Sequence, residues 1–376
     1  MMPVSMDFNE RPFLVIWETT HACDLACLHC RASADPLPAR DELTPNEGLD
    51  LVKQVKDLGV PILIFSGGDP LKRKDLTDLI SYGKSLGLRV GTIPAVTPLL
   101  TKEKIYELKN AGLDQIAFSL DAATADVHDS FRRVDGVFRQ TLESIRIAKE
   151  AGLAVQVNSL VNIHNQEHFD ELIDLVKTLG IVFWEVFFLV PVGRGTELPL
   201  LSAERFDDAF KKIYELHREA PFIIKITEAP HYRQFYIEQQ IKSEGLNLNL
   251  EDRRKLDLPA YFKKVKGPKG SVGRAPAGVN AGKGFVFISH RGEVMPSGFL
   301  PLAAGNLRQQ SLKEIYQDSF LFKNLRDSSL LKGRCGLCPY RDICGGSRSR
   351  AYALTGDYLA EDPCCSFQME AFQALA

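Results

Sequence analysis

Three cysteines, Cys23, Cys27 and Cys30, lie close together near the start of the chain. They follow the apolar run Phe13–Trp17, which is typical of a buried strand. Three thiolates on one short loop can hold three irons of a [4Fe–4S] cluster, and the fourth iron then has no protein ligand. A metal with an open coordination position is suited to catalysis. The spacing therefore favours an iron–sulfur cluster at the end of the first strand.

Other interpretations of the three cysteines remain open on spacing alone. A zinc ion is one, with His21 or His29 as a fourth ligand, and incidental core cysteines are another. A disulfide is disfavoured, because three close cysteines cannot pair evenly. All 8 cysteines of the chain fall in two tight groups. This clustering suits metal ligation in a reducing cytoplasm better than a disulfide framework.

The bulk composition describes an ordinary globular protein. A chain of 376 residues is long for one core, so one large domain with an appendage is expected. The net charge of −2 gives no reason to expect nucleic acid as a partner. No apolar stretch approaches the roughly 20 residues that span a bilayer, and residues 1–12 lack a signal-peptide pattern. We expect a cytoplasmic metalloprotein that binds neither membranes nor nucleic acid.

The first half of the chain repeats a helix, a glycine and a short apolar strand. Glycines that can end a helix in the left-handed conformation are Gly59, Gly87, Gly112, Gly152 and Gly180. Strands are expected at residues 13–18, 61–65, 88–93, 114–120, 154–160 and 182–190. The alternation predicts parallel strands joined by right-handed crossovers. About six strands are too few for an eight-stranded barrel.

The rhythm breaks after residue 195. A helix over 203–219, a strand over 222–227, a hairpin over 284–294 and a helix over 312–325 are expected next. Residues 230–275 are irregular and polar, with a basic cluster between Arg253 and Lys269. This segment is either a solvated surface insertion or a region that binds carboxylates. We therefore divide the chain into residues 1–229, a linker or lid at 230–275, and 276–376.

The cysteine spacing Cys-x-x-x-Cys-x-x-Cys after a first strand resembles the signature of the radical S-adenosylmethionine (SAM) superfamily. Residues 66–70, Ser-Gly-Gly-Asp-Pro, resemble that superfamily's Gly-Gly-Glu motif, with Asp in place of Glu. The C-terminal third resembles the SPASM/Twitch extension, which carries auxiliary clusters. The resemblance covers residues 13–368. It implies an α/β fold, a partial (β/α)6 radical SAM barrel with a C-terminal SPASM/Twitch-like iron–sulfur domain.

Candidate SAM contacts follow the second strand. Parallel α/β architectures place ligands at the carboxyl ends of their strands. Gly67 and Gly68 lack Cβ atoms, so their backbone can approach a ligand closely. Asp69 can accept a hydrogen bond from the SAM ammonium. Because Asp is shorter than the family's Glu, backbone carbonyls are expected to supply most of that contact.

The resemblance also implies SAM contacts at later strands. Ser119 and Asp121 end the fourth strand, and Ser119 and Arg132 match residues that hold the SAM carboxylate in similar enzymes. A surface ion pair is the alternative for Arg132. Asn158 and Val190 lie at the ends of the fifth and sixth strands, in regions that contact ribose and adenine. Trp184 and the phenylalanines near it are expected in the core.

The second cysteine group contains Cys335, Cys338 and Cys344, followed by the adjacent pair Cys364 and Cys365. On spacing alone, a four-cysteine zinc site is an alternative. Residues 336–348 are similar to the SPASM-type cluster-binding segment, and most of all to the heme-biosynthesis subgroup of tetrapyrrole decarboxylases and deacetylases. The last ligand of that subgroup follows an Asp-Pro-x pattern. This pattern points to Cys365, with Cys364 as the second choice.

The resemblance implies one auxiliary [4Fe–4S] cluster. Ser297 and Arg348 stand where proteins with two auxiliary clusters have cysteines. A hydroxyl is a poor iron ligand and a guanidinium is none. The expected metal ligands are therefore the first three cysteines, and Cys335, Cys338, Cys344 and Cys365.

The expected function is that of a radical SAM enzyme. By resemblance, it cleaves SAM to a 5′-deoxyadenosyl radical that takes a hydrogen atom from the substrate. Oxidative decarboxylation or side-chain removal on a tetrapyrrole fits the subgroup, and an electron donor such as flavodoxin or ferredoxin is expected. Radical modification of a ribosomally made peptide is the alternative, although only about a dozen residues precede the first strand. A non-catalytic zinc or iron–sulfur scaffold is a remote alternative function.

Overall fold

A single sheet of ten strands forms the centre of the protein. The computed structural model describes residues 6–248, 252 and 278–367. The strands have the spatial order β10-β9-β8-β1-β2-β3-β4-β5-β6-β7. They are β1 (Leu14–Glu18), β2 (Ile62–Ser66), β3 (Arg89–Thr92), β4 (Gln115–Ser119), β5 (Ala154–Val161), β6 (Phe183–Phe188), β7 (Ile223–Thr227), β8 (Phe285–Ile288), β9 (Glu293–Met295) and β10 (Gly305–Asn306). Neighbours from β8 through β1 to β7 pair in parallel, and β9 and β10 continue antiparallel.

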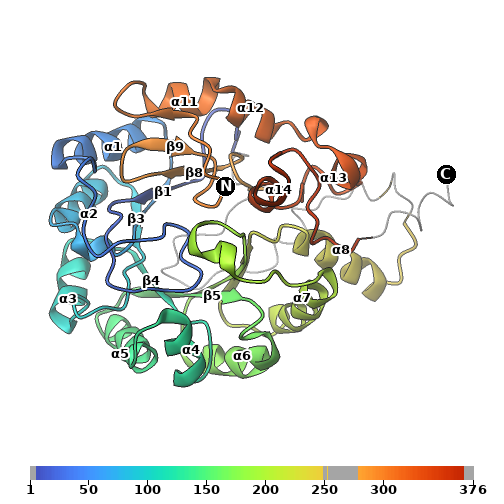
Figure 1. Cartoon of the computed structure of the whole chain (residues 1–376), viewed down its shortest axis with the longest axis horizontal. Coiled ribbons are helices and arrows are strands. Elements are labelled where there is room, and N and C mark those ends of the chain that lie inside the picture. Colours follow the sequence, from blue (N-terminus) through green and yellow to red (C-terminus); the bar gives the residue numbers. More distant parts are fainter. Residues whose placement is uncertain (1–5, 249–251, 253–277, 368–376) are drawn as a thin grey trace.

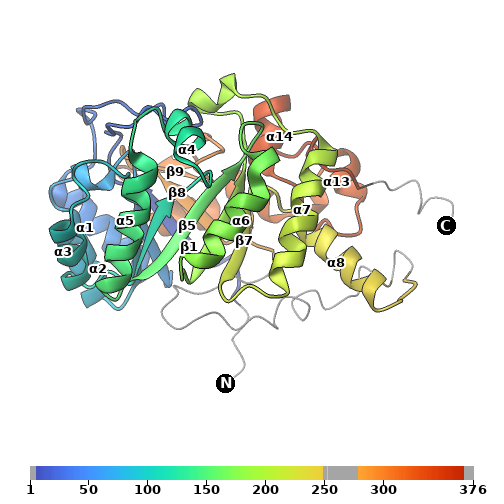
Figure 2. The ribbon, with the colours of Figure 1, turned by 90° about the horizontal axis from the view of Figure 1, so that it is seen from below.

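Helices surround this sheet on its outer side (Figures 1 and 2). They are α1 (Pro45–Asp57), α2 (Leu76–Ser85), α3 (Lys102–Asn110), α4 (Ala125–Arg132), α5 (Val137–Glu150), α6 (Phe169–Thr178), α7 (Ala203–His217), α8 (Tyr232–Ser243), α11 (Leu312–Asp318), α12 (Phe320–Arg326), α13 (Gly333–Leu337) and α14 (Arg348–Thr355). All eight residues of β5 are buried, as expected for a parallel strand that is covered on both faces. Among the described residues, no helix is long and apolar enough to cross a membrane.

Local sequence signals explain where the helices begin and end. Thr44 caps α1: its hydroxyl accepts a hydrogen bond from the backbone N–H of Glu47, whose carboxylate accepts one from the N–H of Thr44. Pro45 occupies the first turn, where no backbone donor is needed. The five glycines predicted to end helices all have φ between 63° and 97°. The helix–glycine–strand repeat is therefore confirmed.

The partial barrel is confirmed, and it extends beyond the six predicted strands. The strand predicted at 222–227 becomes β7 and pairs in parallel with β6. β8 pairs in parallel with β1, with Leu14 opposite Phe285. Residues that we assigned to the C-terminal segment thus share the barrel's sheet, and the proposed domain boundaries stay a prediction.

Three other expectations have different outcomes. The expectation that residues 230–275 are irregular is wrong at its start, where α8 covers Tyr232–Ser243. The single helix predicted over 312–325 is wrong, because Ser319 is extended and separates α11 from α12. The hydroxyl of Ser319 accepts a hydrogen bond from the N–H of Phe322 and so begins the second helix. The basic cluster between Arg253 and Lys269 lies outside the described residues.

The α1 cap gives a first prediction. Thr44→Ala removes the hydroxyl that accepts a hydrogen bond from the backbone N–H of Glu47, and it should destabilise α1 by about 1 kcal/mol. Hydrogen exchange read by mass spectrometry should show faster exchange in the first turn of α1. Thr178→Ala is the control, because its exposed hydroxyl bonds only the carbonyl of Leu175 within α6. Unchanged exchange in the Thr44 variant would contradict the capping role.

Candidate active site

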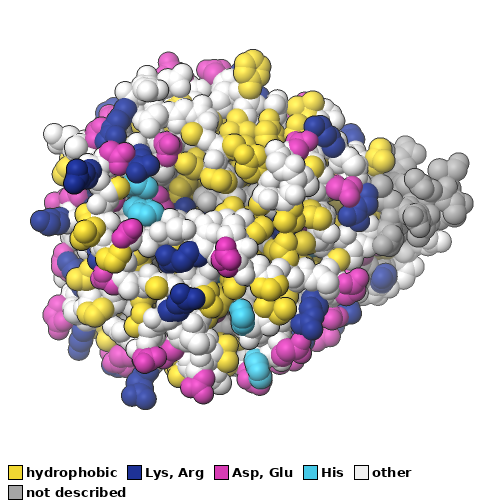
Figure 3. All heavy atoms as spheres, in the orientation of Figure 1, with side chains coloured by type: hydrophobic (Ala, Val, Ile, Leu, Met, Phe, Trp, Pro, Cys, Tyr) yellow, Lys and Arg dark blue, Asp and Glu magenta, His cyan; other side chains and the backbone are white. Residues whose placement is uncertain are grey.

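A cavity of about 230 Å³ lies at the carboxyl ends of the parallel strands. The residues that line it are Cys23, Leu25, Cys27, His29, Cys30, Arg31, Ala34, Ser66, Gly67, Gly68, Ile93, Pro94, Ala95, Val96, Ser119, Asp121, Arg132, Val137, Asn158, Ser159, Leu160, Phe187, Arg194 and Phe299. The cavity therefore brings together all three N-terminal cysteines and most of the predicted SAM-contact residues. On the face seen in Figure 1, hydrophobic side chains gather toward the centre, and charged side chains lie both near the centre and around the rim (Figure 3).

The cysteine loop is held by donors from other parts of the chain. The backbone N–H of Arg194 donates to the carbonyl of Cys30 at 3.0 Å, and its Nε donates to the carbonyl of Cys27 at 2.9 Å. On the other side of the loop, the N–H of Asp69 donates to the carbonyl of Ala22 at 2.6 Å. The segments after β2 and β6 thus fix the loop. Sequence reasoning did not find Arg194, because no motif links it to the cysteines.

Gly67 and Gly68 pack directly on the residues that precede the cysteines. A Cβ on Gly68 would lie 2.4 Å from the carbonyl oxygen of Ala22 and 2.6 Å from that of His21. A Cβ on Gly67 would lie 2.8 Å from the carbonyl oxygen of Thr20. Backbone atoms at these distances cannot move aside cheaply. The two glycines are therefore needed to seat the cysteine loop, in addition to any contact with a ligand.

The donor set at the first cysteine group fits a cluster. Burial raises the pKa of Cys23 to about 12, and the charges of Asp69 and of the other two thiols add to this effect. A thiol with a raised pKa becomes a thiolate readily only when a metal centre neutralises it. Among the described residues, no three His, Cys, Asp or Glu side chains are placed to hold a single metal ion. A cubane cluster has a different requirement, because each thiolate binds a different iron.

The carboxylate of Asp69 is used by the protein itself. It is fully buried and accepts hydrogen bonds from the N–H of Leu71, the N–H of Ala95 and the hydroxyl of Thr97. Burial raises the pKa of Asp69 above its ordinary value. The carboxylate thus ties the glycine turn to the segment after β3. The expected contact between backbone carbonyls and the SAM ammonium stays a prediction.

Arg132 and Asp121 form a buried ion pair beside the cysteines. Their Nη2 and Oδ2 atoms are 2.5 Å apart, and both side chains are at least nine-tenths buried. Burial alone would raise the pKa of Asp121, but the charge of Arg132, together with smaller effects of His29, His128 and the N–H of Leu160, outweighs it, and the pKa is lowered. Nη1 of Arg132 lies 3.5 Å from the sulfur of Cys27. The alternative of a surface ion pair for Arg132 is therefore wrong.

The remaining predicted contacts divide into two groups. Ser119 and Asn158 line the cavity, whereas Val190 is buried and does not.

His29 stacks flat on Phe131, with ring centroids 4.6 Å apart. Burial, together with the charge of Arg132, lowers the pKa of His29 to about 3, so this ring is neutral at pH 7.

An aromatic wall and a further arginine were missed by sequence reasoning. Phe187 from β6 and Phe299 from the turn after β9 both line the cavity, with ring centroids 6.2 Å apart. Trp184 is fully buried, as expected, but Phe187 is not a core residue. Arg31 follows the last cysteine of the loop and also lines the cavity. No spacing rule connects these residues, which converge only through the fold.

The second cysteine group lines a separate pocket. Cys335, Cys338, Cys344 and Cys365 all border it, together with His231. Burial raises the pKa of Cys344, and the other three cysteines of this pocket contribute to the rise. Cys364 does not line the pocket but packs in the main hydrophobic core.

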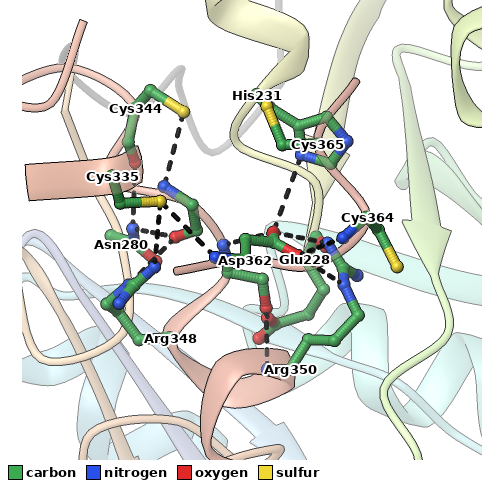
Figure 4. Close-up of polar contacts among 12 residues, drawn as sticks. Glu228, His231, Asn280, Cys335, Cys344, Arg348, Arg350, Asp362, Cys364 and Cys365 are labelled. Carbon is green, nitrogen blue, oxygen red and sulfur yellow. Dashed lines mark hydrogen bonds and ion pairs between the residues drawn. The ribbon is translucent and has the colours of Figure 1, made fainter. Parts of the chain in front are cut away.

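Figure 4 shows the sulfur of Cys364 directed away from Cys335 and Cys344. The N–H of Asp362 lies 3.4 Å from the sulfur of Cys335. Asp362 lies three residues before Cys365. This contact therefore holds the segment that carries Cys365 against the segment that carries Cys335. The geometry supports the expected preference for Cys365 as the fourth ligand.

A buried polar network joins this pocket to the barrel (Figure 4). Arg350 forms two hydrogen bonds to the carboxylate of Asp362 and donates to the backbone carbonyl of Glu228 just after β7. The side chains of both ion-pair partners are 0% exposed. Because a buried charge without its partner is costly, this pair should hold α14 and the segment 357–365 firmly against the barrel.

The two residues that stand in place of cysteines have other partners. The hydroxyl of Ser297 donates to the carboxylate of Glu228. Nη1 of Arg348 donates to the carbonyls of Tyr358 and Ala360. Neither side chain is placed as a metal ligand. Nη2 of Arg348 also lies 3.7 Å from the sulfur of Cys335. The expectation of one auxiliary cluster stays a prediction.

Comparison with known proteins decides the family. Residues 17–179 match the model of the radical SAM superfamily, and residues 280–339 match that of the SPASM iron–sulfur cluster-binding domain. The chain is 40% identical over 361 residues to "AdoMet-dependent heme synthase" of Methanosarcina barkeri, covering 96% of this chain and 98% of that protein. The chain belongs to the radical SAM superfamily. It is a radical SAM enzyme with a SPASM iron–sulfur domain.

Other relatives agree. An "AdoMet-dependent heme synthase" of Oleidesulfovibrio alaskensis is 36% identical, over 94% of this chain and 87% of that protein. "Pre-heme d1 synthase" of Dinoroseobacter shibae is 28% identical, over 94% and 85%. Among solved structures, Streptococcus suis SuiB bound to S-adenosylmethionine has a TM-score of 0.70 at 17% identity, covering 95% of this chain and 78% of that one. The structural likeness shows the fold.

The glycine turn gives a second prediction. Gly68→Ala places a Cβ against two backbone carbonyls and should displace the cysteine loop. We expect reconstituted protein to lose about half of its iron, because the second cysteine group is untouched. Gly83→Ala is the control, because its Cβ would meet only side-chain atoms, the nearest being Val90 Cγ1 at 3.0 Å. Full iron content in the Gly68 variant would show that the loop tolerates the added methyl group.

Proposed function

We propose that the enzyme makes heme from an iron tetrapyrrole by oxidative decarboxylation of propionate side chains. The main support is that this chain is 40% identical to a protein named AdoMet-dependent heme synthase, over 98% of that protein's length. The pocket lined by Cys335, Cys338, Cys344 and Cys365 supports the proposal, because the reaction releases an electron that needs an acceptor. The arginine-bearing and aromatic wall of the SAM-side cavity suits a flat, carboxylate-bearing substrate.

The chemical balance of this reaction defines what the protein must do. Each propionate becomes a vinyl group by losing one hydrogen atom, one electron and CO₂. When bound, the first cluster and SAM supply a 5′-deoxyadenosyl radical, which takes the hydrogen atom. The first cluster must be reduced for each cleavage, so an electron donor such as flavodoxin or ferredoxin is required. The protein's own contribution is to orient the side chain and to exclude water.

We assign the SAM-binding roles as follows. Cys23, Cys27 and Cys30 hold the radical cluster, and the backbone of Gly67 and Gly68 faces the SAM ammonium. Ser119 and Arg132 hold the carboxylate of SAM, with Asp121 fixing the orientation of Arg132. Asn158 and the backbone near Val190 contact ribose and adenine. Of the predicted SAM-contact residues, all except Val190 and Asp69 line one cavity, and this placement supports the assigned roles.

A ribosomally made peptide is the second candidate substrate. SuiB bound to its precursor peptide SuiA has a TM-score of 0.70 with this chain, but the two are only 17% identical. Likeness at that level carries the fold and no substrate. The heme synthases match at 36–40% identity over 94–96% of this chain. The tetrapyrrole is therefore the better supported substrate.

The third prediction tests the reaction. Anaerobic incubation of reconstituted enzyme with SAM, a reductant and iron coproporphyrin III should yield 5′-deoxyadenosine and a porphyrin lighter by the mass of two formic acid units. Replacing Cys23, Cys27 and Cys30 together with Ala should abolish both products while leaving circular dichroism unchanged. Deoxyadenosine formation without any change in the porphyrin mass would refute the substrate assignment. Deoxyadenosine formation by the triple variant would refute the cluster assignment.

The fourth prediction concerns the auxiliary cluster. Two [4Fe–4S] clusters require seven protein thiolates, so intact protein should contain about eight irons and eight sulfides. Cys365→Ala should retain about four irons, whereas Cys364→Ala should retain about eight because its thiol lies outside the pocket. Iron analysis after reconstitution measures both variants. About twelve irons in the intact protein, or zinc in place of iron, would contradict the proposal.

A further inference from the structure

Arg31 occupies a defined place on the wall of the SAM-side cavity. Its side chain is 21% exposed, and its guanidinium carbon lies 4.2 Å from the ring centroid of Phe287 on β8. The turn after β9 leaves room for it: a Cβ on Gly298 would lie 3.0 Å from its Nε. The next residue of that turn is Phe299, which lines the cavity. Arg31 is therefore packed beside the aromatic wall.

Glu18 holds the guanidinium of Arg31 through one of its nitrogens. Nη2 of Arg31 donates to Oε1 of Glu18 at 2.8 Å, and the other oxygen of Glu18 lies 2.7 Å from Nδ1 of His290. Burial alone would raise the pKa of Glu18, but Arg31 and His290 outweigh it and lower the pKa to about 2. Glu18 is thus ionised at neutral pH. It orients Arg31 and leaves the guanidinium's other nitrogens available.

The available donors distinguish Arg31 from the other cations of the cavity. Arg132 is paired with Asp121 and has one nitrogen, Nε, without a hydrogen-bond partner among the described residues. Two nitrogens of Arg194 donate to the carbonyls of Cys27 and Ala34, and one, Nη2, has no partner there. Within the described part of the chain, Nε and Nη1 of Arg31 make no hydrogen bond. A guanidinium held at one nitrogen, with donors left over, is suited to bind a second carboxylate.

The neighbouring wall indicates what carries that carboxylate. Phe187 and Phe299 present two aromatic rings to the same cavity. Aromatic rings offer a large contact area to a flat, apolar partner. A cationic group beside such a wall recognises a planar aromatic molecule with an acidic side chain at its edge.

We propose that Arg31 binds a propionate carboxylate of the tetrapyrrole while Phe187 and Phe299 contact the face of the macrocycle. This inference rests on the proposed function and adds the residue that recognises the substrate's acid groups. Because Arg31 follows Cys30 directly in the chain, the bound propionate lies next to the site of SAM cleavage. Arg31 thereby anchors one acidic side chain of the substrate in the cavity.

The test compares matched variants for binding of two porphyrins. Arg31→Gln alone would leave the buried Glu18 without its guanidinium partner, with only His290 beside it, so the change is made in a Glu18→Gln background. The Glu18→Gln single variant is the reference. Arg291→Gln is a second control, since Arg291 pairs with Asp41 and does not line the cavity. Iron coproporphyrin III and its tetramethyl ester are titrated anaerobically and followed by absorbance, with SAM-dependent deoxyadenosine formation as the check on the cluster.

The double variant should bind iron coproporphyrin III roughly ten- to hundredfold more weakly than the Glu18→Gln reference. The tetramethyl ester carries no charge on its side chains. It should bind the double variant and the Glu18→Gln reference with equal affinity. Equal binding of the acid by both proteins would overturn the role of Arg31 while leaving the proposed function intact. If the wild type cleaves SAM but binds neither porphyrin, the proposed function fails and the inference fails with it.

Discussion

The loop that carries the first three cysteines depends on hydrogen bonds from outside itself. It has almost no regular structure, so its backbone carbonyls must find donors elsewhere. The segment after β2 supplies Asp69, and the segment after β6 supplies Arg194. Both segments occupy carboxyl ends of parallel strands, so the barrel itself determines the shape of the loop. The position of three sulfur atoms is thus a property of the whole sheet.

Charge in the SAM-side cavity is arranged in the same way. Each arginine that lines it is held by a fixed acceptor: Arg31 by Glu18, Arg132 by Asp121, and Arg194 by backbone carbonyls. Side chains fixed in this way lose little rotamer freedom when a ligand binds. They also oppose the entry of bulk water into a site that must protect a radical. The cavity is therefore preorganised by ion pairs and backbone acceptors of the protein, and one of its arginines, Arg132, also lies 3.5 Å from the sulfur of Cys27.

The sequence predicted those parts of the protein that rest on local signals. Cysteine spacing, the cap at Thr44 and the glycine ends of the helices each act within a few residues, and all have the expected form. The pairing of β8 with β1 joins residues about 270 positions apart, which no local pattern encodes. The same holds for Phe299 and Arg194 in the cavity wall. The break at Ser319 did have a local signal, since serine favours helix N-caps.

The tether from Arg194 to Cys27 spans 167 residues of sequence. During synthesis, the cysteine loop emerges long before the segment that holds it, and β8 emerges later still. Closure over such a distance is slow compared with local helix formation. The donor that Arg194 supplies to Cys27 is therefore missing until more than half of the chain is completed. The loop therefore reaches its final shape only when the barrel is nearly complete.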